Sequence, residues 1–267
     1  MLAVCATPIG NLEDVTLRVL SELAAADLVL CEDTRHTRRL LDRHGIRAHL
    51  RSYHEHNEAA RTTEVLPRLQ AGDRIALVSD AGLPGISDPG ARLIRAAVEA
   101  GVAVTVLPGA SAVDTALVAS GFVGERYQFL GFLPRGDAAL ARVWEELAGW
   151  PWPAIAFESP RRLPATLRSL AAADPGRTVA VCREMTKRHE QVVRGKAAEV
   201  AEAFAEPPRG EITLVIGPGA KAEPADPTAA VQAVEELVAS GLPRRTAAQI
   251  VGRLTGVSRR RLYDMSL

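Results

Sequence analysis

The sequence predicts an α/β protein of two α/β domains with a small helical module at the C-terminal end. Two observations lead to this fold class. Short apolar runs rich in Val, Ile and Leu alternate with amphipathic stretches at helical spacing, and the alternation starts again after an irregular stretch at residues 121–136. A stretch dense in Gly, Pro and Ala, residues 217–227, indicates a linker before three short helical stretches. At 267 residues the chain exceeds a typical single domain, so we expect domains at 1–120 and 121–218 and a helical module at 228–267.

The first domain is expected to hold a largely parallel sheet, because strand and helix candidates alternate as in repeated βα units. Glycine follows three helix candidates directly, at Gly45, Gly72 and Gly101, where it is the usual signal for a helix C-terminus. The strand candidates are Leu2–Ala6, Leu28–Cys31, Arg74–Ser79 and Val102–Leu107, and the helix candidates are Thr16–Ala26, Thr37–His44, Asn57–Ala71 and Ala91–Ala100.

The second α/β unit follows the irregular stretch, and the module after it has three short helices. Strands are expected at Ala154–Phe157, Thr178–Arg183 and Glu211–Ile216. Helices are expected at Asp137–Ala148, Arg162–Ala172 and Lys196–Phe204, and then at about Thr228–Ser240, Pro243–Leu254 and Ser258–Met265.

Composition excludes several classes of protein. Lys and Arg balance Asp and Glu at a formal charge of +0, which argues against a uniformly basic nucleic-acid coat but allows a local basic patch. An aromatic content of 4% argues against a broad base-stacking platform. The three cysteines, Cys5, Cys31 and Cys182, lie in or beside apolar runs and are expected to be buried, reduced thiols, which favours a cytoplasmic protein. No apolar stretch is long enough to span a membrane, and no signal-peptide pattern opens the chain.

Ligands of open parallel sheets bind at the carboxyl ends of the strands, so the loops that follow the strands are the places to look for function. Residues 7–12 (TPIGNL) form either a tight βα turn or a close approach to a ligand, and they match no dinucleotide or P-loop fingerprint. Residues 32–37 (EDTRHT) concentrate ionisable groups; Asp33 or Thr34 could cap the next helix, which leaves Glu32, Arg35 and His36 without a structural explanation.

Two further loops are rich in small residues. The glycines and prolines of residues 79–90 (SDAGLPGISDPG) exclude regular structure and expose backbone groups to a small polar ligand. Residues 108–112 (PGASA) open a helix with small residues, which again permit the close approach of a ligand. By contrast, residues 54–58 (HEHNE) alternate imidazoles and carboxylates without an evident third metal ligand, so a polar or RNA-facing loop is favoured over a metal site.

These loops together resemble one known family. The motifs TPIGNL, EDTRHT, HEHNE, LVSDAG, ISDPG, PGASA, GFLPR, FESPRR and REMTKRHE occur in this order over almost all of residues 3–216, and the chain is similar to the ribosomal-RNA small-subunit methyltransferase I family, within the tetrapyrrole methylase-like (class III) methyltransferases. The resemblance implies two α/β domains of the tetrapyrrole methylase type, in a protein that is usually a homodimer. It also implies binding of S-adenosyl-L-methionine between the domains and 2′-O-methylation of a cytidine ribose in small-subunit (16S) rRNA.

The resemblance also implies where the cofactor binds. Leu83 departs from the family pattern, which usually has threonine there, so this chain offers no hydroxyl group at that position. The implied cofactor-binding residues are Pro8, Ile9, Asp80, Gly82, Ile86, Ser87, Pro108, Gly109, Ser111, Ala112, Phe157 and Thr213.

Methyl transfer is an in-line displacement that needs alignment and a proton acceptor but no covalent intermediate. The candidate catalytic residues are Lys187, Glu184, Glu32 and Asp33, with His36 and Glu211 as further candidates for the proton acceptor. Residues 183–187 could equally be a surface ion-pair cluster. No metal is expected.

The C-terminal module carries net positive charge, because residues 228–267 hold six arginines against three acidic residues. Arginines at the starts of two helices resemble a helix-turn-helix-like module that holds phosphates, although a solvated helical face would also carry them. The partner is therefore expected to be small-subunit rRNA or the small ribosomal subunit, and no membrane is expected. The candidate RNA-binding residues are Arg35, His36, His54, Arg244, Arg245, Arg259, Arg260 and Arg261.

Two other functions stay open at this point. A tetrapyrrole-biosynthesis methylase would share the fold and cofactor but should lack the EDTRHT and HEHNE loops and the basic module. A non-catalytic RNA-binding protein would need the basic module but not the loops at 79–90 and 108–112. Binding of labelled S-adenosylmethionine would distinguish either methyltransferase from a non-catalytic RNA-binding protein.

Overall fold

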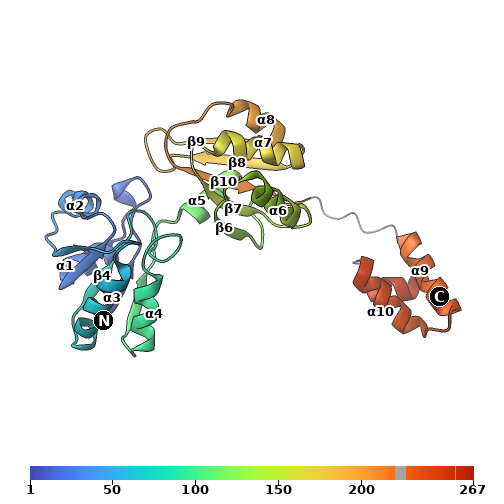
Figure 1. Ribbon diagram of the computed structural model, residues 1–267, viewed down its shortest axis with the longest axis horizontal. Coiled ribbons are helices and arrows are strands. Elements are labelled where there is room, and N and C mark those ends of the chain that lie inside the picture. The colour runs from blue at the N-terminus through green and yellow to red at the C-terminus, as the bar shows by residue number, and fades with distance from the viewer. Residues whose placement is uncertain (220–226, 256) are drawn as a thin grey trace.

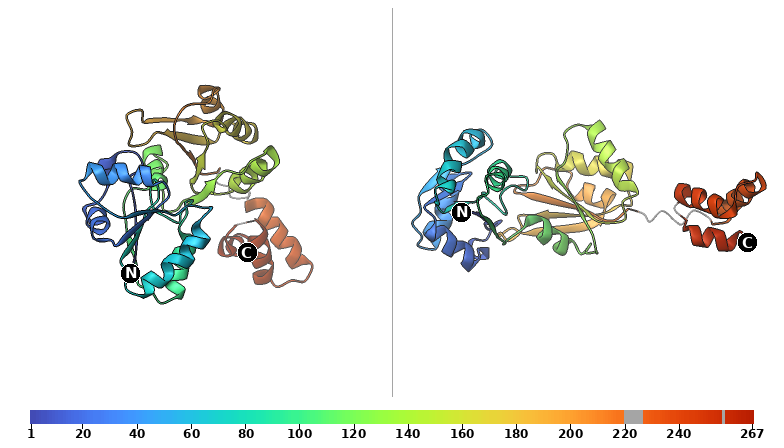
Figure 2. Two further views of the ribbon diagram at one scale, coloured as in Figure 1. Left: turned by 60° about the vertical axis from the view of Figure 1, so that its left-hand side comes forward. Right: turned by 90° about the horizontal axis from the view of Figure 1, so that it is seen from below.

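The computed structural model describes residues 1–219, 227–255 and 257–267. It contains two five-stranded sheets that lie next to each other and a three-helix module set apart from them (Figures 1 and 2). Most of the predicted linker, residues 220–226, lies outside the described residues. No helix in the described part of the chain is long and apolar enough to cross a membrane.

The first sheet is entirely parallel, as predicted, with strand order β3-β2-β4-β1-β5. Its strands are β1 (Leu2–Cys5), β2 (Leu28–Cys31), β3 (Leu50–Ser52), β4 (Ile75–Leu77) and β5 (Val104–Leu107). Its helices are α1 (Leu17–Ala25), α2 (Thr34–Arg43), α3 (Glu58–Gln70) and α4 (Ala91–Glu99), with a 3-10 turn η1 (Leu12–Asp14) before α1. Strand β3 was not predicted.

Alternation along the strands places the helices on both faces of this sheet. Leu2 and Val4 pack with Val65 of α3 and Leu93 of α4, whereas Ala3 and Cys5 pack on the opposite face with α1 and α2. Each large apolar side chain buried in this way contributes about 1.5–3 kcal/mol. The C-terminal glycine signals are confirmed, because Gly45, Gly72 and Gly101 follow α2, α3 and α4 with positive φ.

The second sheet is mixed rather than parallel, with order β6-β7-β10-β8-β9 and only the β6–β7 pair parallel. Its strands are β6 (Gln128–Phe132), β7 (Ala154–Glu158), β8 (Thr178–Arg183), β9 (Gln191–Lys196) and β10 (Ile212–Ile216). Strands β6 and β9, the two edges, were not predicted. The antiparallel pairs arise because β8 and β9 form a hairpin and β10 runs between β7 and β8.

Helices cover both faces of the second sheet. On one face lie α6 (Asp137–Ala148), α7 (Leu163–Ala173) and α8 (Ala197–Ala203). On the other lies α5 (Ala112–Ser120), which packs Val113 and Leu117 on this sheet although it directly follows the first sheet in the chain. Helix α5 therefore joins the two sheets (Figure 1). The predicted domain boundaries remain predictions.

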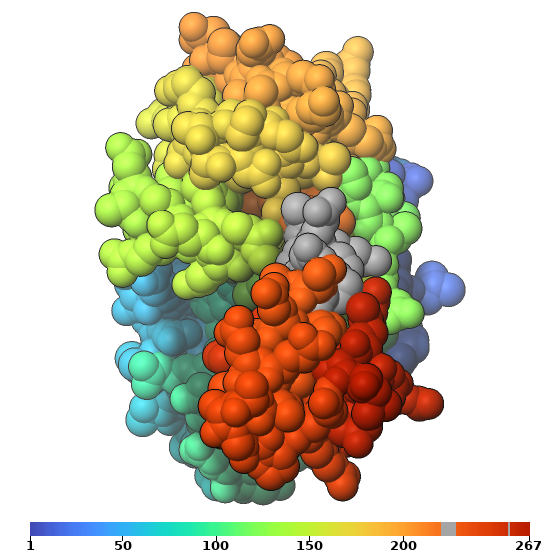
Figure 3. Space-filling model, turned by 90° about the vertical axis from the view of Figure 1, so that its right-hand side faces the viewer, coloured from blue at the N-terminus to red at the C-terminus, as the bar shows by residue number. Residues whose placement is uncertain are grey.

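The C-terminal module consists of α9 (Pro227–Ala239), α10 (Arg244–Thr255) and α11 (Arg259–Met265), close to the predicted bounds. It has a small core of its own, in which Val234, Ala248, Val251 and Leu262 are buried. In Figure 3 this module faces the viewer in orange and red, in front of the two larger parts of the molecule.

Candidate active site

A cavity of about 750 Å³ lies where the two sheets face each other, a size typical of ligand pockets. The carboxyl ends of the first sheet's strands supply one wall. The second sheet supplies the other from the ends of β6 and β7, the loop after β8 and the start of β10. Most of the cofactor-binding residues implied by the resemblance line this cavity. These are Ile9, Gly82, Ile86, Ser87, Pro108, Gly109, Ser111, Ala112, Phe157 and Thr213, together with Leu83.

Hydrogen bonds tie the first loop of the site to the loop at 79–90. Thr7 N donates to the Gly82 carbonyl at 2.8 Å, and Gly82 N donates back to the Thr7 carbonyl at 3.0 Å. The Thr7 hydroxyl also donates to the Ser79 carbonyl at 3.0 Å. Gly82 has φ +76°, which a side chain would strain, so glycine is needed for this pairing.

Pro8 and Asp80 do not line the cavity, although the resemblance implies cofactor contacts for both. Asp80 instead supports the neighbouring loop, because its Oδ1 accepts a hydrogen bond from Asp33 N at 3.1 Å.

An acidic group forms where the loops after β2 and β4 meet. Asp88 lines the cavity, and burial, together with the charges of Glu32 and Asp80, raises its pKa to about 6. Burial and the charge of Asp80 also raise the pKa of Glu32. In the described part of the chain neither Asp88 nor Glu32 has a hydrogen bond or an ion pair to its carboxyl group.

Asp33 caps α2, as the sequence allowed. Its Oδ1 accepts from Arg35 N at 2.8 Å, and its Oδ2 pairs with Arg35 Nη2 at 2.7 Å. These bonds from Arg35 hold the pKa of Asp33 well below its usual range. Arg35 and His36 are exposed at the start of this helix.

The loop at 54–58 gives no support for a metal site. The Asn57 side-chain amide lies 3.0 Å from His54 Nε2, so this ring nitrogen is already engaged. The His54 and His56 rings meet edge to face with centroids 6.0 Å apart. Among the described residues, no group of three or more His, Cys, Asp or Glu side chains could hold a metal ion.

On the second-sheet side, Lys187 links two carboxylates at the rim of the cavity. Its Nζ donates to Glu184 Oε1 at 2.9 Å and to Glu211 Oε2 at 2.8 Å. Burial alone would lower the pKa of Lys187, but the hydrogen bonds to Glu211 and Glu184 outweigh it and raise that pKa. A hydrogen bond from the Glu211 backbone N–H lowers the pKa of Glu184. Lys187 is therefore a cation at neutral pH, and of the three residues only Glu211 lines the cavity.

The same loop closes against the first sheet. Asn11 N donates to the Thr186 hydroxyl at 3.0 Å. A Cβ on Gly10 would lie 2.6 Å from Lys187 Cγ and from Thr186 Oγ1, so only glycine fits there. Glu184 and Thr186 have φ of 52° and 66°, which is uncommon for residues with side chains.

Sequence reasoning missed several residues that line the cavity, above all Asp88 and Phe132. Asp88 lies in the quoted ISDPG motif, where a carboxyl group next to the loop glycines was a usable signal. Phe132 ends β6, whose sequence QFLGF is rich in aromatic residues that favour strands. That stretch lay within the region interpreted as irregular.

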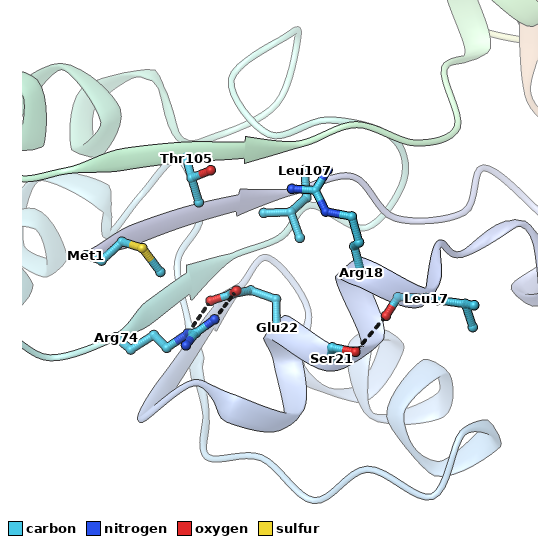
Figure 4. Close-up of a pocket in the computed structure, with 8 residues that line it drawn as sticks. All are labelled: Met1, Leu17, Arg18, Ser21, Glu22, Arg74, Thr105 and Leu107. Atoms are coloured by element: carbon cyan, nitrogen blue, oxygen red, sulfur yellow. Dashed lines mark hydrogen bonds and ion pairs between the residues drawn. The ribbon is translucent and has the colours of Figure 1, made fainter.

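A second cavity, of about 470 Å³, lies between α1 and the edge strand β5 (Figure 4). Beside it Arg74 donates from Nε and Nη2 to the two carboxylate oxygens of Glu22, at 2.7 and 2.5 Å. The hydrogen bonds from Arg74 lower the pKa of the buried Glu22. Because these two charges satisfy each other, this pair stabilises the contact of α1 with the sheet and offers no free group for chemistry.

Comparison with known proteins identifies the family. Residues 1–201 match the family model for tetrapyrrole (corrin/porphyrin) methylases, and residues 224–267 match that for the RsmI C-terminal HTH domain. A protein of Mycobacterium bovis named ribosomal RNA small subunit methyltransferase I is 45% identical over 98% of this chain and 93% of its own length. Its namesake in Mesorhizobium japonicum is 44% identical over 98% of this chain and 90% of its own length. The chain belongs to the ribosomal RNA small subunit methyltransferase I family. It is thus a member of a methyltransferase family, as the motifs indicated.

Solved structures agree on the fold of the two sheets. The methyltransferase CobJ superposes with a TM-score of 0.63 at 21% identity, covering 82% of this chain and 94% of its own. Uroporphyrin-III C-methyltransferase from Thermus thermophilus, complexed with S-adenosylhomocysteine, gives 0.58 at 19% identity, covering 81% and 96%. The tetrapyrrole methylase fold is therefore confirmed, and the family match of residues 224–267 confirms the additional helical module.

Proposed function

We propose that this protein transfers a methyl group from S-adenosyl-L-methionine to the 2′-hydroxyl of a cytidine ribose in small-subunit (16S) rRNA. The observation that carries the proposal is the cavity around which the family motifs of both sheets meet. The names of its relatives supply the substrate class, small-subunit ribosomal RNA.

The cavity residues fit a nucleoside cofactor. Small residues in the apolar walls, Ala6, Gly109 and Ala110, leave room for the cofactor. The hydroxyl groups of Ser111 and Thr213 supply polar contacts. When bound, S-adenosylmethionine supplies a methyl group on a positively charged sulfur. The protein's part is to orient that group and the acceptor in line and to receive the acceptor's proton.

Asp88 is the best-placed residue to receive that proton. Four acidic residues line the cavity in the described part of the chain, and three of them are already engaged. Glu158 accepts from Thr166, Glu211 is bound to Lys187, and Asp114 accepts from Tyr127. Asp88 has no hydrogen-bond partner among the described residues and a pKa of about 6, so it is ionised but still basic at neutral pH.

The other candidate catalytic residues then take supporting roles. Burial and then the charge of Glu32 raise the pKa of Asp88, so Glu32 has an electrostatic role. Lys187 holds Glu211 and Glu184 at the opposite rim as a fixed cation, and Asp33 anchors the start of α2 beside Asp80. In this proposal none of these four accepts the proton.

RNA contact by the C-terminal module is supported by the placement of its arginines. Arg244 and Arg245 open α10, and Arg259, Arg260 and Arg261 open α11, where the helix dipole disfavours cations. A bound phosphate would offset that cost. Exposed Arg35 and His36, with half-buried His54, would extend the RNA contact along the first domain.

We further propose a homodimer that works in the cytoplasm, where ribosomal subunits are assembled. Exposed apolar side chains support self-association, including Leu17 on α1 and Val106 on the edge strand β5, which are 82% and 51% exposed. The buried, unpaired cysteines are consistent with a reducing compartment.

The proposal is tested by incubating the protein with labelled S-adenosylmethionine and with small subunits from a strain that lacks this enzyme. We expect label in 16S rRNA and one position that resists alkaline cleavage, because methylation blocks the oxygen that would attack the neighbouring phosphate. Cleavage at every position would refute the 2′-O assignment. Label in a tetrapyrrole but not in RNA would favour the biosynthetic alternative, and failure to bind S-adenosylmethionine would favour a non-catalytic RNA-binding protein.

A further inference from the structure

Strand β6 ends in a bulge that directs one aromatic side chain to the cavity. Its pairing with β7 is regular at Phe129 but shifts before Phe132, which pairs with Phe157. Gly131 lies in this shift with φ +66°, a conformation that favours glycine. Bulges of this kind re-aim side chains and are common beside active sites.

Phe132 is exposed to an unusual degree for a phenylalanine. It is 62% exposed, yet it lines the cavity and meets the Phe157 ring edge to face with centroids 5.4 Å apart. Phe157 is half-buried and pairs with Thr213 on its other side. A row of cavity residues therefore runs from Thr213 through Phe157 to Phe132, which lies on the edge strand at the solvent side.

The loop of the first sheet reaches the same place. A Cβ on Gly131 would lie 3.8 Å from Ser87 Oγ, so the β6 bulge is close to the residue that precedes Asp88. A ligand on the Phe132 ring would consequently lie beside the loop that carries the proposed proton acceptor.

Two unpaired arginines lie in the loops next to Phe132. Arg162 joins these loops, since its Nη2 donates to the carbonyls of Leu133 and Pro134 at 2.9 and 2.6 Å and lies 3.2 Å from the buried Glu158. Arg135 and Arg161 are exposed in the two joined loops. Within the described ranges, neither has a hydrogen bond or an ion pair.

We propose that Phe132 stacks on the base of the nucleotide whose ribose is methylated, and that Arg135 and Arg161 hold the phosphates next to it. This inference rests on the proposed function and adds how the RNA is held. Single-stranded RNA is recognised largely by stacking of splayed bases on aromatic side chains. In this proposal the half-buried Phe157, deeper in the row, contacts the cofactor and not the RNA base.

Methyl transfer to small subunits by Phe132→Ala and Phe132→Tyr tests the stacking. We expect Phe132→Ala to raise the KM for the subunit about 10-fold or more, while the Kd for S-adenosylmethionine changes less than about 2-fold. Phe132→Tyr should restore the KM, because the ring face is kept. Val98→Ala on α4 is the control, since Val98 is 61% exposed and lies outside the cavity.

The arginines are tested by the double variant Arg135→Gln/Arg161→Gln. We expect weaker subunit binding and a less negative salt dependence of the affinity, by about 0.7 in the log–log slope for each phosphate that is no longer bound. An unchanged slope would contradict their role.

Three results would overturn the stacking proposal. If Phe132→Ala raised the Kd for S-adenosylmethionine as much as the KM for the subunit, the ring would contact the cofactor instead. An unchanged KM would show that the ring holds neither ligand. Absence of RNA methylation by the wild-type protein would refute the proposed function itself, whereas the first two results leave that function intact.

Discussion

Asp88 has an environment unlike that of an ordinary surface carboxyl group. It lies in a glycine-rich loop, lines the cavity and has no hydrogen-bond donor among the described residues. Burial and the charges of two further carboxyl groups raise its pKa. Carboxyl groups withdrawn from water are normally hydrogen-bonded, so the half-buried Asp88 costs stability while it has no partner. Such a cost is common where a group must stay reactive.

We expect Asp88→Asn to lower turnover by about 10²–10⁴-fold, the usual contribution of a positioned acid or base. The Kd for S-adenosylmethionine should change little, because the group acts on the acceptor. In the wild-type protein the rate should rise with pH through about 6 as Asp88 loses its proton. Single-turnover rates across pH measure this, with Asp137→Asn, an exposed acid on α6, as the control. Full activity in Asp88→Asn would return Glu32 to consideration.

The same pKa shift predicts a change in stability. The folded-state pKa of Asp88, about 6, lies above the ordinary value of 3.8, so its contribution is complete below the ordinary value and is lost as pH rises through about 6. Asp88→Asn should therefore be more stable than the wild type at pH 8, by about 1 kcal/mol after solvent screening is considered. The two proteins should unfold alike near pH 4. Urea unfolding at both pH values measures the difference, and a less stable variant at pH 8 would contradict the assignment.

At the scale of elements, the contact between the turn after β1 and the loop after β8 fixes the two walls of the cavity. Gly10 packs against Lys187, Thr186 and the Met185 carbonyl, and these contacts join residues far apart in the chain. The alignment of the two walls therefore depends on one position without a side chain.

We expect Gly10→Ala to destabilise the protein by about 1–3 kcal/mol, the usual cost of overpacking. Its Cβ would lie 2.8 Å from the Met185 carbonyl oxygen, a backbone atom that cannot move aside easily. Gly149→Ala is the matched control, because no atom of the described residues lies within 4 Å of that Cβ and its φ is −94°. Thermal unfolding of both variants measures the difference. Equal stability of the two would show that the packing at Gly10 is loose.

Sequence patterns predicted the central strands of both sheets and the edge strand β5, but not the edge strands β3, β6 and β9. The predicted bounds of β2, β8 and α6 agree with the structure. A continuous apolar run is a clear signal of a buried strand, and helical periodicity is a clear signal of an amphipathic helix. Strands β3 and β9 are short or half-exposed, and β6 contains the bulge at Gly131. Parallel or antiparallel pairing in the second sheet depends on tertiary contacts, which alternation alone does not specify.

The sequence predicted which loops line the cavity but not which partners their side chains contact. Motif loops placed Gly82, Ser111 and Thr213 at the cavity correctly, since strand ends of one sheet meet at one edge. The same logic could not show that Asp80 turns away to bind Asp33. It also could not show that Lys187 is held by two carboxylates, because these partners come from distant parts of the chain.

At the scale of the whole molecule, the three-helix module has its own core, and none of its described residues lines the cavity. Cofactor binding and RNA affinity should therefore be separable. Its arginines lie mostly exposed at the starts of α10 and α11, and the first turns of these helices contain no acidic residue.

Removal of residues 228–267 is expected to leave the Kd for S-adenosylmethionine unchanged and to weaken binding to small subunits or 16S rRNA. For each phosphate that is no longer bound, the slope of log K against log salt should become less negative by about 0.7, because fewer counterions are released. Arg259→Gln/Arg260→Gln/Arg261→Gln tests the charges alone, since the three side chains are exposed and Leu262 still anchors α11 in the module's core. Filter binding at several salt concentrations measures all three slopes. If the truncated protein and the glutamine variant keep the wild-type slope, the module does not bind phosphates, and the basic contact must be sought at Arg35, Arg135 and Arg161.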